Sequence, residues 1–346
     1  MTQLRRPPAR AGGFCFDPLP GSPFGTLARA ESGAGLAAVM AAAERSPDVL
    51  PAAMDAADGL LVLRGLLEIA SAPRRLVELS RLFGPEVEDY RLALVPASMV
   101  HPEVPEILIV SNVAPVSRQP PARPVPPLTA DGRLPTQFPH RRGWHSDQSY
   151  RRPPPDVSLF YAMQPTPQGQ GQTLYANGIA AYEALPPELA RQVEGLVGLH
   201  TRSGTGRTEQ AVRAGETPRP LAPHERPQRQ PVVRVHPVTG RRALFLCEAG
   251  QMDWVDGPFV GMEPGPDGAG AELLYALMRH ATDPRFTYTH EWERGDLVIY
   301  DNRTVLHTAT WFDATAHERV MWRTTVMGNP GPEYAGEARS WLVRSS

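Results

Sequence analysis

The sequence of 346 residues contains no lysine, so all 35 of its basic residues are arginine. The absence of lysine excludes Schiff-base chemistry and any reaction that uses a lysine nucleophile. Cysteine is scarce as well, because Cys15 and Cys247 are too few for a disulfide framework. Cys247 lies in the apolar run "RALFLCE", where we expect a small buried hydrophobic residue rather than a ligand or nucleophile.

Long apolar runs and a strong charge imbalance are missing too. The formal net charge of −2 provides no field that would attract nucleic acid or an anionic membrane. A membrane-spanning helix needs about 18 or more apolar residues, and no window approaches that length. The arginine-containing N-terminus has no apolar segment behind it, as a secretory signal would. These absences predict a protein of the reducing cytoplasm, without nucleic-acid or membrane partners.

Strand-like segments outnumber helical ones, and the two kinds do not alternate regularly. This order argues against a doubly wound parallel sheet and favours a mainly β fold, a two-sheet barrel or jelly roll with peripheral helices. Strands are expected within 59–65, 106–112, 156–163, 172–177, 198–203, 232–247, 286–302 and 319–328. Helices are expected within 35–46, 72–84, 178–185, 187–196 and 271–282.

The domain organisation is predicted from where this periodicity is lost. Residues 1–33 are rich in glycine, proline and arginine, and we expect them to form a loosely ordered arm. Residues 34–346 are expected to form a single domain. Two aperiodic stretches, 113–143 and 203–230, are predicted to be long loops within it, and a lid over a site is one role for such a loop.

The first long loop leads into His145-Ser146-Asp147. Side chains two positions apart on a strand point the same way, so His145 and Asp147 can meet at one point. They would supply two of the three ligands of a 2-His-1-carboxylate triad, which is typical of non-haem Fe(II) oxygenases. A second histidine is then required, and His307 supplies it after a strand at 296–300 and a short turn. His101 and Glu103 form a similar pair, but no strand adjoins them.

The segment "ERVMWRTTVMG" adds two arginines. Read as a strand, it places Arg319, Met321 and Arg323 on one face, with Val320 and Trp322 on the other. The two arginines would lie about 13 Å apart along the strand. If they face the interior, each needs an anion, whereas the alternative is that both point to solvent.

Together, His145-Ser146-Asp147, "GQGQTLYANGIAAYEAL" and "YDNRTVLHTATWFDATAHERVMWRTTVMG" resemble the taurine dioxygenase and 2,4-dichlorophenoxyacetate dioxygenase (TauD/TfdA) family. The resemblance covers most of residues 55–330. It implies a double-stranded β-helix (a cupin-like jelly roll) and a reaction that uses Fe(II), 2-oxoglutarate and O₂. Such an enzyme hydroxylates or desaturates an unactivated C–H bond of a small molecule and releases succinate and CO₂. It also implies a homo-oligomer, either a dimer or a tetramer.

The resemblance assigns roles to individual residues. His145, Asp147 and His307 match the iron ligands. Thr173 and Arg319 match the residues that bind the far carboxylate of 2-oxoglutarate, which a planar guanidinium suits well. Arg323 matches the arginine that, in several members, holds the anionic group of the substrate.

The residues indicate the substrate only as a class, and we expect a small anionic or amino-acid-like molecule. The segment "FGPEVEDYRLA" replaces a histidine-rich segment that taurine dioxygenase uses on its substrate, so taurine is not expected; an acidic side chain there would suit an amine or guanidine. Arg151 and Arg152 are interpreted as surface charges. Further candidates for the pocket wall are Tyr90, Asn112, Tyr150, Trp311 and Phe312.

Two other classes of function remain open from the residues alone. A zinc hydrolase can use the same two histidines and carboxylate. A non-catalytic jelly-roll binding protein is the other possibility, although it would have no use for three ligands. Neither alternative gives a role to Thr173 and Arg319.

Overall fold

The computed structural model describes residues 6–93, 95–123, 143–248, 251–328 and 339–340. Its largest sheet has eight strands, and all its neighbours pair antiparallel except β3 and β4, which pair parallel. In order across the sheet the strands are β1 (Arg10–Ala11), β2 (Phe14–Pro18), β3 (Thr26–Ala30), β4 (Leu60–Leu63), β13 (Leu297–Asp301), β6 (Val157–Gln164), β15 (Val320–Val326) and β5 (Leu108–Ser111).

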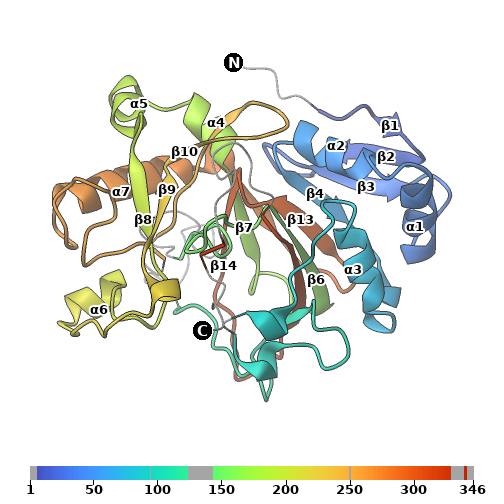
Figure 1. Ribbon diagram of the computed structural model, residues 1–346. Helices are drawn as coiled ribbons and strands as arrows, with labels where there is room; N and C mark the ends of the chain where they lie inside the picture. Colours follow the sequence, from blue (N-terminus) through green and yellow to red (C-terminus); the bar gives the residue numbers. More distant parts are fainter. Residues whose placement is uncertain (1–5, 94, 124–142, 249–250, 329–338, 341–346) are drawn as a thin grey trace.

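A second sheet of three strands faces the central part of the first. Its order is β12 (Thr287–His290), β7 (Thr173–Asn177) and β14 (Val305–Ala309). Two short antiparallel strand pairs lie to one side of it (Figure 1). They are β8 (Val197–His200) with β9 (Gln228–Pro231), and β10 (Val233–Val235) with β11 (Arg242–Leu244).

The alternation of side chains divides the core into three layers. Along β4, Leu60 and Val62 belong to the cluster between the two sheets, whereas Leu61 and Leu63 belong to the cluster on the outer face of the larger sheet. Strand β15 obeys the same rule, because Met321 packs between the sheets and Trp322 packs outside. This alternation decides which residues can reach the space between the sheets.

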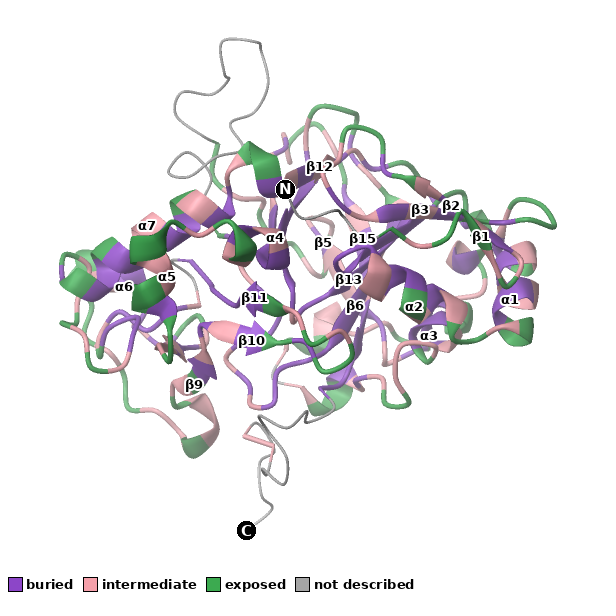
Figure 2. Ribbon diagram, turned by 90° about the horizontal axis from the view of Figure 1, so that it is seen from above, coloured by how far each residue is buried: buried purple, intermediate pink, exposed green. Residues whose placement is uncertain are grey.

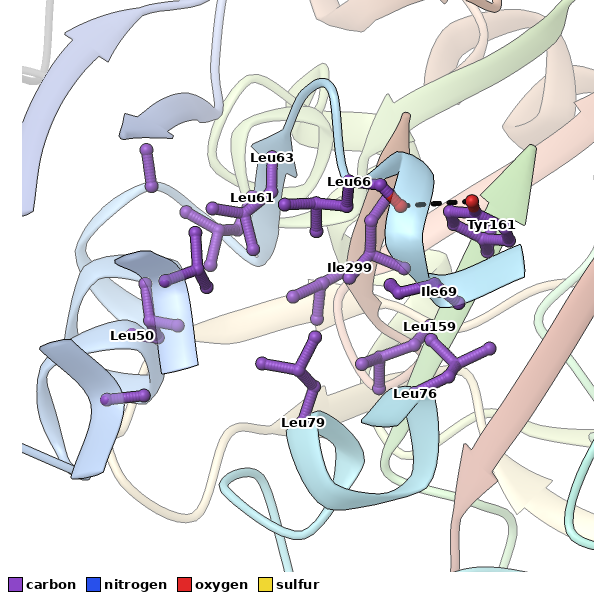
Figure 3. Close-up of a cluster of buried hydrophobic side chains, with 14 of the residues drawn as sticks. Leu50, Leu61, Leu63, Leu66, Ile69, Leu76, Leu79, Leu159, Tyr161 and Ile299 are labelled. Carbon is purple, nitrogen blue, oxygen red and sulfur yellow. Dashed lines mark hydrogen bonds between the residues drawn. The ribbon is translucent and has the colours of Figure 1, made fainter. Parts of the chain in front are cut away.

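Three helices cover the outer face of the larger sheet, namely α1 (Leu36–Arg45), α2 (Val49–Ala56) and α3 (Arg74–Ser80). Their apolar sides meet the outward residues of β4, β6 and β13, as Figure 3 shows. Tyr161 is buried in this layer and satisfies its hydroxyl by donating to the carbonyl oxygen of Leu66, at 3.0 Å. Burial of this kind contributes about 25 cal/mol per Å² of apolar surface.

The outer face of the smaller sheet is covered by α4 (Gly178–Glu183), α5 (Pro187–Val193) and α7 (Ala269–Ala281). Helix α4 begins at Asn177, whose side chain accepts a hydrogen bond from the amide of Ala180 at 2.9 Å. Helix α6 (Glu209–Arg213) lies at the periphery. Five short 3₁₀ turns complete the described elements: η1 (Leu67–Ala70), η2 (Tyr90–Leu92), η3 (Ala97–Met99), η4 (Pro223–Glu225) and η5 (Pro284–Phe286).

Buried residues concentrate on the strands and on the inner sides of the helices, and exposed residues on the rim (Figure 2). Within the described residues, none of the helices has both the length and the apolar character that crossing a membrane requires.

Three expectations from the sequence differ from the structure. The arm expected over 1–33 contains β1, β2 and β3, and Phe14 and Phe16 of β2 are buried against α1 and α2. Glycines and prolines around these short strands hide their alternation. The turn expected before His307 is present at 302–304, but His307 itself is buried within strand β14. The expected loop 203–230 contains α6, η4 and the start of β9. Most of the loop expected at 113–143, residues 124–142, lies outside the described residues.

His200 on β8 yields a prediction about stability and pH. It is fully buried, it stacks on Phe245, and neither ring nitrogen has a hydrogen-bond partner within the described residues. Burial, with a smaller effect of Arg234, lowers the pKa of His200 to about 3. Below about pH 6.5, His200 is therefore protonated in the unfolded chain but stays neutral in the folded chain.

We expect the free energy of unfolding to be highest above about pH 6.5 and to fall by about 1.4 kcal/mol per pH unit as pH drops toward 3, for this residue alone. Urea unfolding at pH 5 and pH 8 measures the difference, which should be smaller in His200→Leu. An equal pH dependence in the variant and the parent would contradict this role of His200.

Candidate metal centre and cofactor pocket

His145, Asp147 and His307 converge on one point, as the sequence predicted. Their ligand atoms all lie within 4.8 Å of one another. The Nε2 atoms of His145 and His307 lie 3.9 and 3.8 Å from Oδ1 of Asp147. His145 is fixed next to β14, because its amide and carbonyl both bond those of His307 at 2.9 Å.

The two imidazoles are prepared to donate a lone pair. Nδ1 of His145 lies 2.7 Å from the carbonyl oxygen of Gly143, which can only accept, so Nδ1 carries the proton and Nε2 is left free. Burial lowers the pKa of both histidines, and it lowers that of His307 to about 3. Both rings are therefore neutral near pH 7, which is the form that binds metals.

Asp147 is held as a carboxylate by hydrogen bonds from three strands. Its Oδ2 accepts from the hydroxyls of Ser158 at 2.9 Å and Tyr300 at 2.8 Å, and its Oδ1 accepts from Arg323. Asn302 accepts from the amide of Asp147 at 3.2 Å and donates to Ser158 at 2.9 Å. Burial raises the pKa of Asp147, but Arg323 and the two histidines outweigh it and hold this pKa well below its usual range.

A cavity of about 310 Å³ opens beside these groups, between the two sheets. Within the described residues its lining includes three arginines and two histidines but no aspartate or glutamate. The lining residues are Val110, Ser111, Asn112, Arg118, Gln119, Pro120, Pro121, His145, Phe160, Thr173, Tyr300, His307, Ala309, Thr310, Phe312, Arg319 and Arg323. The cavity is thus positively charged.

Arg319 is a buried charge of this cavity that lacks a counterion among the described residues. It is only 6% exposed, lies over the ring of Phe160 at 5.8 Å, and its buried Nε and Nη2 have no hydrogen-bond partner in the described part of the chain. Burial lowers the pKa of Arg319 to about 10, which still leaves it protonated at pH 7. A buried guanidinium without a counterion is costly, so the cavity is built to receive an anion here.

Thr173 on β7 lines the same cavity. Its hydroxyl oxygen accepts a hydrogen bond from Nε1 of Trp292 at 3.0 Å. The hydroxyl proton is therefore available to donate. A carboxylate that reaches Arg319 can accept from Thr173 as well, and the residues present fit one end of a dicarboxylic keto acid.

The donor set at the other side fits a divalent metal. Two neutral imidazole nitrogens and one ionised carboxylate, each oriented by a hydrogen bond or by a neighbouring strand, leave the cavity side free for other ligands. Arg319 and Arg323 share a face, as the strand alternation predicted, and that face lines the cavity, so the alternative in which both point to solvent does not hold.

Of the other residues expected in the pocket wall, some line the cavity and others do not. Asn112 lines the cavity, but its side chain accepts from the amide of Arg319 at 2.7 Å and donates to the carbonyl of His317 at 2.9 Å, so it positions β15. Phe312 also lines the cavity, whereas Tyr150 and Trp311 are not among the lining residues. The ring of Trp311 lies under Arg123, at 4.8 Å.

Tyr90 and Arg151 do not lie where the sequence pattern suggested. Tyr90 is fully buried behind the cavity wall, where its hydroxyl lies 2.6 Å from Oγ1 of Thr325. Arg151 is not a surface charge, because it is 4% exposed and pairs with Glu88. Glu88 therefore has an internal guanidinium partner in place of the ligand amine that its sequence position suggested.

Several residues of the site escaped the sequence analysis. Tyr300 could have been found, because it lies two positions after the inward-facing Val298 on β13. Ser158 likewise lies two positions before Phe160 on β6 and therefore shares its inward face. Arg118 offered no such signal, since it lies in an aperiodic, proline-rich stretch.

The comparisons with known proteins agree with this geometry. A family model described as "Taurine catabolism dioxygenase TauD, TfdA family" matches residues 17–325. The chain therefore belongs to this family of dioxygenases.

Two characterised relatives show the range of that family. The alpha-ketoglutarate-dependent 2,4-dichlorophenoxyacetate dioxygenase of Burkholderia sp. (strain RASC) is 35% identical over 189 residues, which cover 54% of this chain and 58% of that enzyme. Pentalenolactone F synthase of Streptomyces arenae is 31% identical over 250 residues, or 70% of this chain and 76% of that enzyme. The chain thus matches little more than half the length of the first relative.

Solved structures are similar over nearly the whole chain. A structure of AAD-2 in complex with Mn(II) and N-oxalylglycine has a TM-score of 0.61 and 25% identity, and the match covers 92% of this chain and 98% of that one. A taurine dioxygenase from Burkholderia xenovorans, with a TM-score of 0.59 and 24% identity over 93% of this chain and 92% of that one, has the same fold.

The hydrogen bonds to Asp147 yield a prediction about metal affinity. Tyr300→Phe removes one donor to Oδ2 and should weaken Mn(II) binding about tenfold, because groups that orient a ligand typically contribute 10- to 100-fold. Calorimetric titration measures the affinity. Tyr288→Phe is the matched control, because its hydroxyl lies 3.0 Å from Nδ1 of His290 and not at Asp147. Equal affinities in the two variants would contradict the role given to Tyr300.

Proposed function

We propose that the protein is an Fe(II)- and 2-oxoglutarate-dependent dioxygenase on a double-stranded β-helix. It hydroxylates, or desaturates, an unactivated C–H bond of a small anionic or amino-acid-like molecule. The observation that carries the proposal is the arrangement of one cavity. His145 and His307 line this cavity, and Asp147 lies directly behind them within ligand distance of both. In the same wall lies Arg319, which is buried and has no counterion among the described residues.

Each residue has a distinct task in this proposal. His145, Asp147 and His307 would hold the iron, which when bound supplies the activation of O₂ that is coupled to decarboxylation of 2-oxoglutarate to succinate and CO₂. Arg319 and Thr173 fix the position of the co-substrate through its far carboxylate. A planar guanidinium and a hydroxyl donor at that end set both the length and the orientation of the acid that binds.

The remaining residues prepare these groups. Ser158, Tyr300 and Arg323 keep Asp147 ionised and oriented. The carbonyl of Gly143 selects the tautomer of His145 that can bind a metal. A hydrolase that used zinc at the same three ligands would leave the desolvated charge of Arg319 without a purpose, so the observations favour the oxygenase.

The reaction class is tested by consumption of the co-substrate. The purified protein, reconstituted with Fe(II) and supplied with 2-oxoglutarate and O₂, should release succinate, and Asp147→Ala should release far less. A panel of amino acids, sulfonates, aryloxy acids and sulfate esters, screened by succinate yield, would identify the substrate class. Failure to bind 2-oxoglutarate, together with no succinate release under any of these conditions, would exclude the proposed function.

The role of Arg319 is tested separately by binding. Arg319→Gln should raise the Kd for 2-oxoglutarate at least about 30-fold, because removing one partner of a buried charge pair costs about 2–5 kcal/mol. Calorimetry on the metal-loaded, oxygen-free protein gives this constant. Arg81→Gln, an exposed arginine on the outer layer, is the control and should leave the constant unchanged. An unchanged Kd in Arg319→Gln would show that another residue binds the far carboxylate.

A further inference from the structure

Arg118 brings a third guanidinium into the cavity. The chain leaves β5 at Ser111, turns, and returns so that the amide of Arg118 donates to the carbonyl of Ser111 at 2.8 Å. Ser117, just before it, has a φ of 50°, which a non-glycine residue adopts only in a constrained turn. The backbone of Arg118 is therefore anchored to the edge of the larger sheet, and its side chain lines the cavity.

The side chain of Arg118 has no hydrogen-bond or ion-pair partner in the part of the chain that the structure describes. It remains accessible to solvent, so it is available to a ligand. Burial is the main reason why the pKa of Arg319 is lowered, and the positive charge of Arg118 lowers it further. Arg118 also interacts electrostatically with Arg323 and with Asp147.

The cavity would keep an excess of positive charge even with the metal and 2-oxoglutarate bound. Among the residues that the structure describes, Arg118, Arg319 and Arg323 carry three positive charges and Asp147 supplies one negative charge, so an excess of two positive charges remains. A divalent metal and 2-oxoglutarate bring equal and opposite charges and leave this excess unchanged. The far carboxylate of 2-oxoglutarate would occupy Arg319. Arg323 contacts Asp147 through Nη1, but it also lines the cavity and its Nε has no hydrogen-bond partner among the described residues, so Arg323 and Arg118 are left to face the primary substrate.

We propose that the primary substrate carries a compact, doubly negative oxyanion, a phosphate monoester or a phosphonate, that Arg118 and Arg323 bind together. This inference rests on the proposed function and narrows its substrate class. Several oxygens on one tetrahedral centre can accept from two guanidinium groups at once, and two unit charges match the excess. A singly charged carboxylate or sulfate ester would leave one guanidinium uncompensated.

The experiment compares two probes of the same shape and different charge. At pH 8 methyl phosphate is a dianion, because its second pKa is about 6, whereas methyl sulfate is a monoanion. Both are titrated calorimetrically into the oxygen-free Fe(II) enzyme saturated with 2-oxoglutarate, so that Arg319 is already occupied. The same titrations are repeated with Arg118→Gln, Arg118→Lys and the exposed control Arg81→Gln.

We expect the parent enzyme to bind methyl phosphate at least about tenfold more tightly than methyl sulfate. Arg118→Gln should abolish most of that preference, Arg118→Lys should retain part of it, and Arg81→Gln should retain all of it. Equal affinity of the parent for the two probes, tighter binding of the sulfate, or an unchanged preference in Arg118→Gln would overturn the proposal.

The titration that precedes the probes separates this result from the proposed function. If the metal-loaded parent does not bind 2-oxoglutarate, the proposed function fails before Arg118 is tested. If 2-oxoglutarate binds and the phosphate preference is absent, the enzyme class stands and only the assignment of a doubly charged substrate is wrong.

Discussion

The site depends on an imbalance of charge in a protected space. Asp147 lies against two imidazoles and Arg323, while Arg319 lines the adjoining cavity with no anion of its own in the described residues. Burying such a guanidinium opposes folding, and it is tolerated where a ligand restores neutrality. The positive cavity therefore favours anionic ligands, and the ionised Asp147 with its two neutral histidines favours a divalent metal. Both preferences follow from the same arrangement of side chains.

The fold delivers that arrangement through strand alternation. Thr173, Phe160 and His307 lie on three different strands, yet all point into the space between the two sheets, because the intervening residues pack outward into apolar clusters. The packed outward residues make the sheets rigid, and a rigid scaffold can hold polar groups in an arrangement that would otherwise be energetically unfavourable. His145 joins this scaffold through its backbone bonds to His307.

The sequence predicted the parts of the site that follow a local rule. Arg319 and Arg323 are an even number of positions apart, so period-two reasoning placed them on one face of the same segment, and both line the cavity. His145 and Asp147 do meet at one point, but His145 lies at an isolated bridge to His307 and Asp147 in the turn that follows, not on the strand that the sequence suggested. Contacts between distant positions have no such signature, which is why Arg151 was taken for a surface charge although it pairs with Glu88. Strands β1 to β3 were missed because glycine and proline interrupt them, and Arg118 because its stretch has no periodicity.

The central claim is that the triad and Arg319 bind their ligands as one unit. Oxygen-free calorimetry of 2-oxoglutarate, with and without Fe(II), tests it most directly, because two ligands that share a site must change each other's affinity equally. The account predicts one 2-oxoglutarate per chain in the metal-loaded protein and at least about tenfold weaker binding without metal. Binding with the same affinity in both states would contradict it.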